Sequence, residues 1–150
     1  MSEKSKLATA QTNGMRGVYL VASELARWGL ISSPTSRSAR GADILATTPD
    51  LRKAFSVEVK TTTNNKFWQL SPHVKLTRSD SHIYVFVRIW KPKNGGELIT
   101  YYPVSSEFVA ENSRLPNPEK EEQYRNGYTM DLKTVEQFKD NWSIFGLPEC

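Results

Sequence analysis

The sequence predicts an α/β fold in which helices flank a mixed central sheet. Three observations support this fold class. Apolar side chains recur at helical spacing in residues 15–28 and again in residues 132–142. Runs rich in β-branched and aromatic residues alternate with polar turns between these two segments. Helical segments at both ends of a group of strands are typical of a layered α/β domain, so we expect the strands to form its centre.

The first helix is expected over residues 15–28, and Gly29 is well placed to end it. Its apolar positions follow the pattern i, i+3, i+4, i+7 and i+10, which gives one buried stripe. We interpret residues 1–13 as a flexible arm and residues 14–150 as a single domain with a C-terminal helical extension. The stripe consists of Val18, Val21, Ala22, Leu25 and Trp28.

Residues 42–47 and 54–61 are predicted to form a hairpin that turns between Asp50 and Leu51. Partner residues in such a hairpin have numbers that sum to 101, which sets Asp43 opposite Glu58. Strand alternation turns Lys60 to the same face as Glu58. The sequence therefore predicts a patch with two carboxylates and one ammonium.

The remaining elements follow from apolar runs and capping residues. Ser71 followed by Pro72 suits a helix start, and Ser105 can cap a short helix that ends near residue 111. Residues 112–129 are expected to be a polar loop, and the last helix is expected over residues 132–142. The predicted further strands are a short one at 30–35, a strand or aromatic flap at 67–70, and a second hairpin at 82–90 and 97–104.

Length and composition restrict the class of protein. A chain of 150 residues suits one domain with a hydrophobic core. The only cysteine is Cys150, so the sequence excludes an intrachain disulfide and a cysteine-based zinc site. No apolar run has the length of a membrane span, and the N-terminus is too polar for a signal peptide. We therefore expect a cytoplasmic protein that does not bind membranes.

The charge is unevenly distributed along the chain. Residues 1–95 contain 15 lysines and arginines against 6 acids, whereas residues 96–150 contain 5 against 10. The basic excess lies in the half that carries the predicted carboxylate patch. Such an excess favours a polyanionic partner, although a solvated basic surface with an acidic tail fits the charge equally well.

The patch has the chemistry of a magnesium site. Mg²⁺ binds oxygen ligands, commonly two carboxylates together with water and phosphate oxygens. Asp43 and Glu58 offer the carboxylates, and the backbone carbonyl of Val59 is a candidate third ligand. The ammonium of Lys60 can orient an attacking water or stabilise negative charge that develops on a phosphate.

Three runs carry a resemblance to a known family. They are GMRGVYLVASELARWGL at 14–30, GADIL at 41–45 and FSVEVKT at 55–61. Together they resemble the PD-(D/E)XK nuclease superfamily, including its Holliday-junction-resolvase-like branch, over about residues 14–104. The resemblance implies a restriction-endonuclease-like αβββαβ core and Mg²⁺-dependent cleavage of DNA, with Mn²⁺ able to substitute. It also implies that Asp43 and Glu58 bind the metal and that Lys60 is the catalytic lysine.

The chain departs from the family pattern in the first helix. Many members carry a glutamate there directly after a glycine, whereas Gly17 is followed here by Val18. Glu24 lies six residues later, about 240° around the helix, so it should not point the same way. Either the chain uses a reduced set of Asp43, Glu58 and Lys60, or its metal site is weakened.

Five basic residues are candidates for nucleic-acid binding. Arg37 and Arg40 lie in the loop before Asp43, where they can hold a phosphate. Lys66, Lys75 and Arg78 follow Lys60 and are interleaved with aromatic residues, a pattern typical of contacts with a nucleic-acid backbone.

The aromatic and histidine residues near the patch have simpler interpretations. Phe67 and Trp68 can stack a base, but we favour a place in the core. His73 and His82 have no ligand spacing and are interpreted as structural. Gln69 is a weak candidate for supporting the site, on position alone.

Three functions remain open from the sequence. The first is a Mg²⁺-dependent endonuclease acting on double-stranded or branched DNA. The second is an inactive relative that binds nucleic acid or serves in assembly, and the third is an interaction protein in which strands 82–104 form an oligomer interface. Many nucleases of this fold act as homodimers because two strands need two sites, but no heptad marks an interface here.

Overall fold

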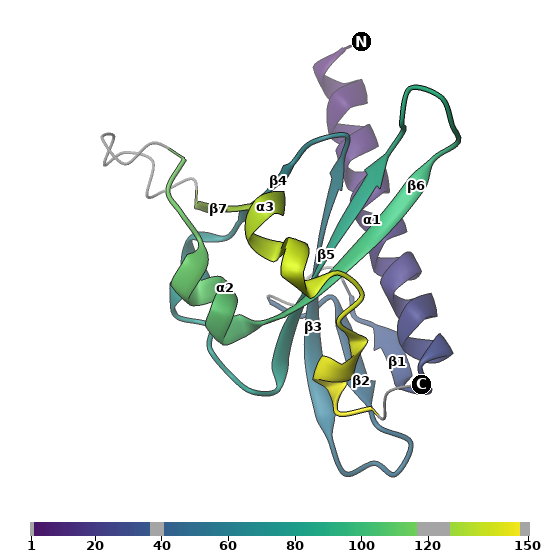
Figure 1. Ribbon diagram of the computed structural model, residues 1–150, viewed down its shortest axis with the longest axis vertical. Helices are drawn as coiled ribbons and strands as arrows, with labels where there is room; N and C mark the ends of the chain where they lie inside the picture. Colours follow the sequence, from purple (N-terminus) through teal and green to yellow (C-terminus); the bar gives the residue numbers. More distant parts are fainter. Residues whose placement is uncertain (1, 37–40, 117–126, 148–150) are drawn as a thin grey trace.

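The computed structural model describes residues 2–36, 41–116 and 127–147, and its centre is a five-stranded mixed sheet. The strand order is β1-β2-β3-β5-β6, with β3 and β5 parallel and the other neighbours antiparallel. Helices lie on both sides of this sheet, which confirms the predicted fold class (Figure 1). The strands are β1 (Ile31–Pro34), β2 (Ile44–Thr47), β3 (Ala54–Thr63), β5 (His82–Trp90) and β6 (Leu98–Ser105).

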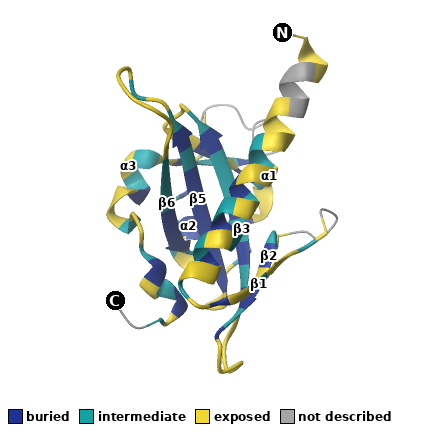
Figure 2. Ribbon diagram, turned by 90° about the vertical axis from the view of Figure 1, so that its right-hand side faces the viewer, coloured by how far each residue is buried: buried dark blue, intermediate teal, exposed yellow. Residues whose placement is uncertain are grey.

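Helix α1 (Glu3–Arg27) crosses one face of the sheet and packs its apolar stripe on β3 and β5 (Figure 2). Gly17 allows this close approach, because a Cβ at that position would collide with the side chain of Thr61 on β3. The 3₁₀ helix η4 (Trp142–Phe145) covers the same face, where Phe145 meets Phe55 edge to face. None of the described helices is long and apolar enough to cross a membrane.

The N-terminal end of α1 differs from the prediction. The helix begins at Glu3, so the segment expected to be an irregular arm is helical over most of its length. Its sequence contains Glu, Lys, Leu, Ala and Gln, which favour helix, and no proline interrupts it. Each added residue gains one hydrogen bond once the packed half has formed, so the helix extends beyond the sheet (Figure 1).

A second layer covers the opposite face of the sheet. Strand β4 (Phe67–Leu70) pairs with β7 (Tyr128–Asp131) in a small antiparallel sheet. Trp68 is buried there, and its indole Nε1 donates to the carbonyl of Val87 at 2.9 Å, so the core interpretation of Trp68 is confirmed. The turn η1 (Pro72–Lys75) and helix α2 (Ser106–Asn112) complete the layer. The connection between β3 and β5 therefore contains strand β4 and the 3₁₀ turn η1.

Both predicted caps are confirmed. The hydroxyl of Ser71 accepts from the N–H of His73 at the start of η1, at 3.2 Å. The hydroxyl of Ser105 accepts from the N–H of Phe108 at the start of α2, also at 3.2 Å. These short-range contacts were readable from the sequence because each partner lies within three residues.

The predicted last helix over residues 132–142 is wrong. The structure breaks it into α3 (Leu132–Val135), η3 (Glu136–Phe138) and η4. Asp140 has a φ of 54° and donates its N–H to the carbonyl of Tyr101 on β6 at 2.9 Å. A left-handed residue cannot continue a right-handed helix, so docking onto β6 ends the helical pattern.

Candidate active site

Asp43 lies at a bulge just before β2. The ladder between β2 and β3 pairs Ile44 with Val57, and these residue numbers have the sum of 101 that was predicted for partners in this hairpin. The N–H of Asp43 also donates to the carbonyl of Val57, at 2.9 Å. Two successive residues therefore oppose one residue of β3, which is the pattern of a β-bulge. The predicted pairing of Asp43 with Glu58 does not continue through this bulge.

The bulge brings the Asp43 side chain onto the backbone of the Glu58-Val59-Lys60 triplet. Its Oδ2 accepts from the N–H of Val59 at 2.7 Å. The N–H and C=O of one strand residue point to the same side, so the carbonyl of Val59 also faces the edge where Asp43 lies. A carboxylate and a backbone carbonyl thus adjoin each other beside the triplet.

Glu58 is a largely buried carboxylate with three neighbours on the same face of the sheet. Its Oε1 lies 2.9 Å from Lys60 Nζ, and its Oε2 lies 3.6 Å from His82 Nε2. Burial alone would raise the pKa of Glu58, but His82 and the Lys60 ammonium together lower this pKa to about 2. Glu58 is therefore ionised at neutral pH. Burial and the nearby carboxylate raise the pKa of the third neighbour, Tyr84, which stays protonated.

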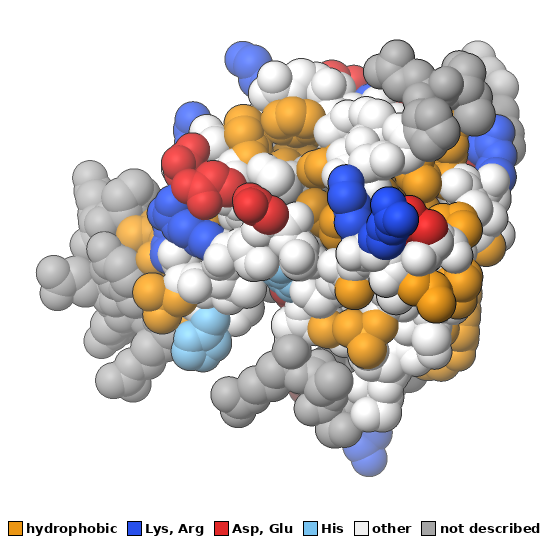
Figure 3. All heavy atoms as spheres, turned by 90° about the horizontal axis from the view of Figure 1, so that it is seen from below, with side chains coloured by type: hydrophobic (Ala, Val, Ile, Leu, Met, Phe, Trp, Pro, Cys, Tyr) orange, Lys and Arg blue, Asp and Glu red, His pale blue; other side chains and the backbone are white. Residues whose placement is uncertain are grey.

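Two hollows adjoin the edge where β2 and β3 separate. Glu58 opens on a cleft of about 940 Å³ bounded by η1 and the start of β5, and in Figure 3 the surface is hollowed with histidine atoms visible inside. Asp43 opens on a smaller hollow of about 460 Å³ beside α1, which Val18 also lines. Val18, which stands where many superfamily members carry a glutamate, therefore lines the same hollow as Asp43.

Two polar residues considered from the sequence have clear positions. Glu24 is 3.3 Å from Arg27 on α1 and is not among the residues that line the hollow at Asp43, as its helical position predicted. Gln69 and Lys60 line a third hollow, between α1 and β4, so Gln69 lies near the candidate lysine.

The candidate donors are of the chemical kind that a hard divalent cation binds, although Asp43 and Glu58 line different hollows. Two carboxylates and the Val59 carbonyl are oxygen donors, and ionised Glu58 needs no proton release before it binds a metal. Within the described ranges, no group of three or more His, Cys, Asp or Glu side chains could hold a metal ion. Water and phosphate oxygens would have to supply the remaining ligands of the cation.

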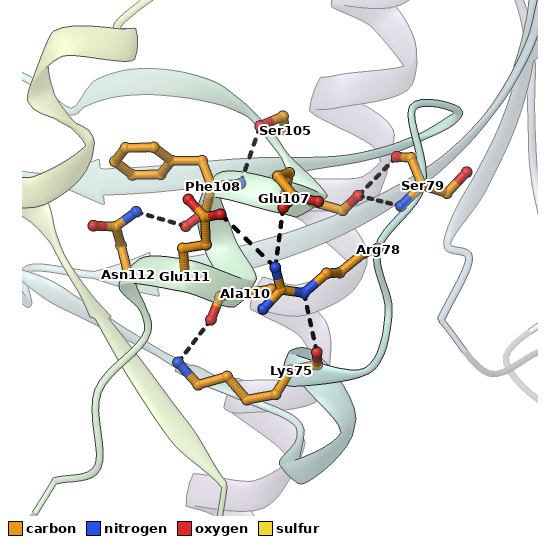
Figure 4. Close-up of polar contacts among 10 residues, drawn as sticks. Lys75, Arg78, Ser79, Ser105, Glu107, Phe108, Ala110, Glu111 and Asn112 are labelled. Carbon is orange, nitrogen blue, oxygen red and sulfur yellow. Dashed lines mark hydrogen bonds and ion pairs between the residues drawn. The ribbon is translucent and has the colours of Figure 1, made fainter.

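Two of the basic candidates are engaged with α2. Lys75 Nζ donates to the carbonyl of Ala110 at 2.7 Å, near the C-terminal end of this helix (Figure 4). It also donates to the carbonyl of Ser113, which follows the helix, at 2.8 Å. Arg78 lies 3.0 Å from Glu107 and 3.8 Å from Glu111.

The other basic candidates differ in their surroundings. Lys66 is exposed beside β4. Arg37 and Arg40 lie outside the described residues. A contact between any of the five basic residues and nucleic acid stays a prediction.

Sequence reasoning missed the neighbours that β5 supplies to Glu58. The parallel register pairs Ser56 with His82 and Glu58 with Tyr84, so β5 places its first polar side chains beside the carboxylate. The sequence favours a structural role for His82, and no motif in it singles out Tyr84. The alternation of polar and apolar residues at the start of β5 was the available signal, but its register against β3 depends on a connection of 18 residues.

Comparison with solved structures identifies the fold. The chain superposes on Hjc, a Holliday junction resolvase from the archaeal hyperthermophile Archaeoglobus fulgidus, with a TM-score of 0.54 and 12% sequence identity. The match covers 91% of this chain and 98% of that structure, so the predicted resemblance in fold is confirmed. No protein-family model matches the sequence, and no curated protein does either.

Proposed function

We propose that this protein is a Mg²⁺-dependent nuclease that hydrolyses DNA phosphodiester bonds, with Asp43 and Glu58 as metal ligands. The observation that carries the proposal is the pairing of a largely buried, ionised Glu58 with Lys60, while the Asp43 carboxylate accepts from the N–H of the intervening Val59. A bound Mg²⁺ would neutralise phosphate charge and acidify a water molecule. The Val59 carbonyl is proposed as a further ligand, and Mn²⁺ is expected to substitute.

Lys60 is proposed as the group that acts on the attacking water. Its ammonium is held 2.9 Å from Glu58 Oε1, so its position is fixed before substrate arrives. From there it can donate a hydrogen bond to the water or to a phosphate oxygen that gains negative charge. Asp43 accepts from the Val59 N–H, which keeps its carboxylate at the start of the triplet.

Branched DNA is the substrate class we favour, because the fold is similar to that of a Holliday junction resolvase. Lys66, Arg37 and Arg40 are proposed to contact phosphates near the cleft. A homodimer is proposed on the same grounds, since two strands of a junction need two sites. The cytoplasm is proposed as the place where it acts.

The test is metal-dependent cleavage across linear, nicked, flapped and four-way DNA, run beside Glu58→Ala. We expect cutting by the wild-type protein with Mg²⁺ or Mn²⁺, and none by the variant at equal fold stability. Sedimentation of the same samples measures the oligomeric state. Cutting that persists in Glu58→Ala would contradict the assignment of Glu58.

A second candidate is an inactive nuclease-fold protein that binds nucleic acid or serves in assembly. Val18 favours it, because an apolar side chain lines the hollow at Asp43 where many relatives carry a further carboxylate. DNA binding that weakens with salt, is unchanged by Glu58→Ala and occurs without cutting would support this candidate.

A further inference from the structure

A cluster of polar side chains on β3 and β5 adjoins Glu58 in the wall of the cleft. Ser56 and Glu58 project from β3, and His82 and Tyr84 project from β5 at the paired positions. His82 and Tyr84 are buried, with 5% and 2% of their surface exposed. Ser56, His82 and Tyr84 nevertheless line the cleft on which Glu58 opens, so the two rings form part of its wall.

The imidazole of His82 is held at one nitrogen and unpaired at the other. Nδ1 lies 2.7 Å from the hydroxyl oxygen of Ser56. Nε2 is buried without a hydrogen-bond partner, and Glu58 Oε2 lies 3.6 Å from it. An unsatisfied buried nitrogen is costly, so its placement against a carboxylate needs an explanation.

The Ser56 hydroxyl can donate to or accept from Nδ1, so the Glu58 carboxylate decides between the two tautomers of a neutral His82. If the serine hydroxyl donates to Nδ1, the ring proton resides on Nε2 and points toward Glu58. The opposite arrangement would aim a nitrogen lone pair at a carboxylate and would be repulsive. The first arrangement makes Nε2–H a donor that a small movement of Glu58 would bring into hydrogen-bond range.

Aromatic packing fixes the rings of this cluster. The rings of His82 and Tyr84 meet edge to face, with centroids 5.2 Å apart, and Tyr84 stacks on Phe86 at 5.9 Å. Burial, together with the nearby Glu58 carboxylate, raises the pKa of the Tyr84 hydroxyl. Rings held in this way cannot turn freely, so His82 Nε2 keeps its direction toward Glu58.

We propose that His82, oriented by Ser56, and Tyr84 are positioning residues that hold the Glu58 carboxylate in the orientation needed to bind a divalent cation. This inference rests on the proposed function, because it requires Glu58 to be a metal ligand. Hydrogen-bond partners of metal ligands commonly change metal affinity by about 10- to 100-fold. The role differs from catalysis, since neither ring needs to touch the substrate.

The experiment measures Mn²⁺ affinity in the full chain without DNA, by the loss of the electron paramagnetic signal of free Mn²⁺. We expect His82→Ala to weaken binding by about 10- to 100-fold and Tyr84→Phe to weaken it by a smaller factor. His82→Gln should recover most of the affinity, because its amide nitrogen can donate from near the Nε2 position. His73→Ala, which deletes the other histidine of the same cleft, is the matched control and should bind like the wild type.

A spectroscopic readout tests the orientation independently of metal and of cutting. Nitrogen-15 shifts of the His82 ring should show the proton on Nε2 in the wild type and a changed tautomer ratio in Ser56→Ala. A proton on Nδ1 alone in the wild type would overturn the proposal, as would Mn²⁺ binding of wild-type strength in folded His82→Ala and Tyr84→Phe.

The Glu58→Ala variant distinguishes a failure of the positioning role from a failure of the proposed metal site. If the wild type binds Mn²⁺ through Glu58 and the cluster variants bind equally well, only the positioning role fails. If the wild type binds no Mn²⁺ and cuts no DNA, the metal-site assignment and the positioning role fail together. Retained Mn²⁺ binding by Glu58→Ala has the same consequence for both.

Discussion

Two ion pairs on the face of the sheet opposite α1 consist of similar side chains but differ in how far they are exposed to solvent. Glu58 and Lys60 lie 2.9 Å apart, with 12% and 27% of their side chains exposed. Arg78 and Glu107 lie 3.0 Å apart, with 42% and 60% exposed. The two distances are nearly equal, so the difference between the pairs lies in their exposure to water.

The difference shows why charge alone is a poor guide to function in this chain. An exposed pair is screened by water and contributes at most about 1 kcal/mol. A buried carboxylate depends on its partners to stay ionised, and its pKa responds strongly to them. Arg78 pairs with Glu107 and Glu111 and so connects the segment after η1 to α2 (Figure 4). The pair of Glu58 with Lys60 instead keeps a charged carboxylate at the edge of a cleft.

The largest expected effect is on DNA cleavage. Glu58→Gln and Lys60→Met should each lower the cleavage rate by at least about 10²-fold, because each removes a charge needed where the phosphate reacts. Glu107→Gln removes a carboxylate of the exposed pair and should leave the rate unchanged. Single-turnover rates on four-way DNA measure the effect, and equal rates for Glu58→Gln and Glu107→Gln would remove the functional distinction between the clusters.

The next effect is on stability at low pH. The pKa of Glu58 falls from its usual value near 4.5 to about 2 in the folded protein. Its contribution to stability, up to about 3 kcal/mol, is therefore present above pH 4.5 and is lost as the pH falls toward 2. Urea unfolding between pH 7 and pH 2 should show this loss in the wild type. The loss should be smaller in Glu58→Gln, and parallel curves would contradict the low pKa.

A smaller effect is expected at the C-terminal end of α2. Lys75→Met removes an ammonium that donates to two helix-end carbonyls. The free energy of unfolding should fall by roughly 1 kcal/mol, as expected for a cation at this end of a helix. Lys93→Met, an exposed lysine in the β5–β6 turn, is the control and should change it little. Urea unfolding at pH 7 distinguishes them.

The smallest effect is expected for Arg78. Arg78→Ala should lower the free energy of unfolding by less than about 1 kcal/mol, because its ion pairs are exposed.

Arg78→Ala should also leave the salt dependence of DNA binding unchanged, since the guanidinium is paired with acids. Lys66→Ala should lower the slope of log affinity against log salt by about one. A similar decrease for Arg78→Ala would show that Arg78 leaves α2 to bind phosphate.

The sequence by itself determined the elements whose signals are local. The 82–90 strand, the hairpin register at Ile44 and Val57, and the caps at Ser71 and Ser105 all rest on residues close in the chain. The triplet ending at Lys60 was found in the same way. Local periodicity and turn chemistry carry this information because backbone geometry imposes them on neighbouring residues.

The tertiary structure decided which side chains meet. The bulge moved Asp43 onto the Val59 N–H, and the parallel pairing of β3 with β5 brought His82 and Tyr84 to Glu58. Packing against α2 engaged Lys75 and Arg78, and docking on β6 broke the last predicted helix. These outcomes depend on contacts between distant segments, whose register no local pattern specifies.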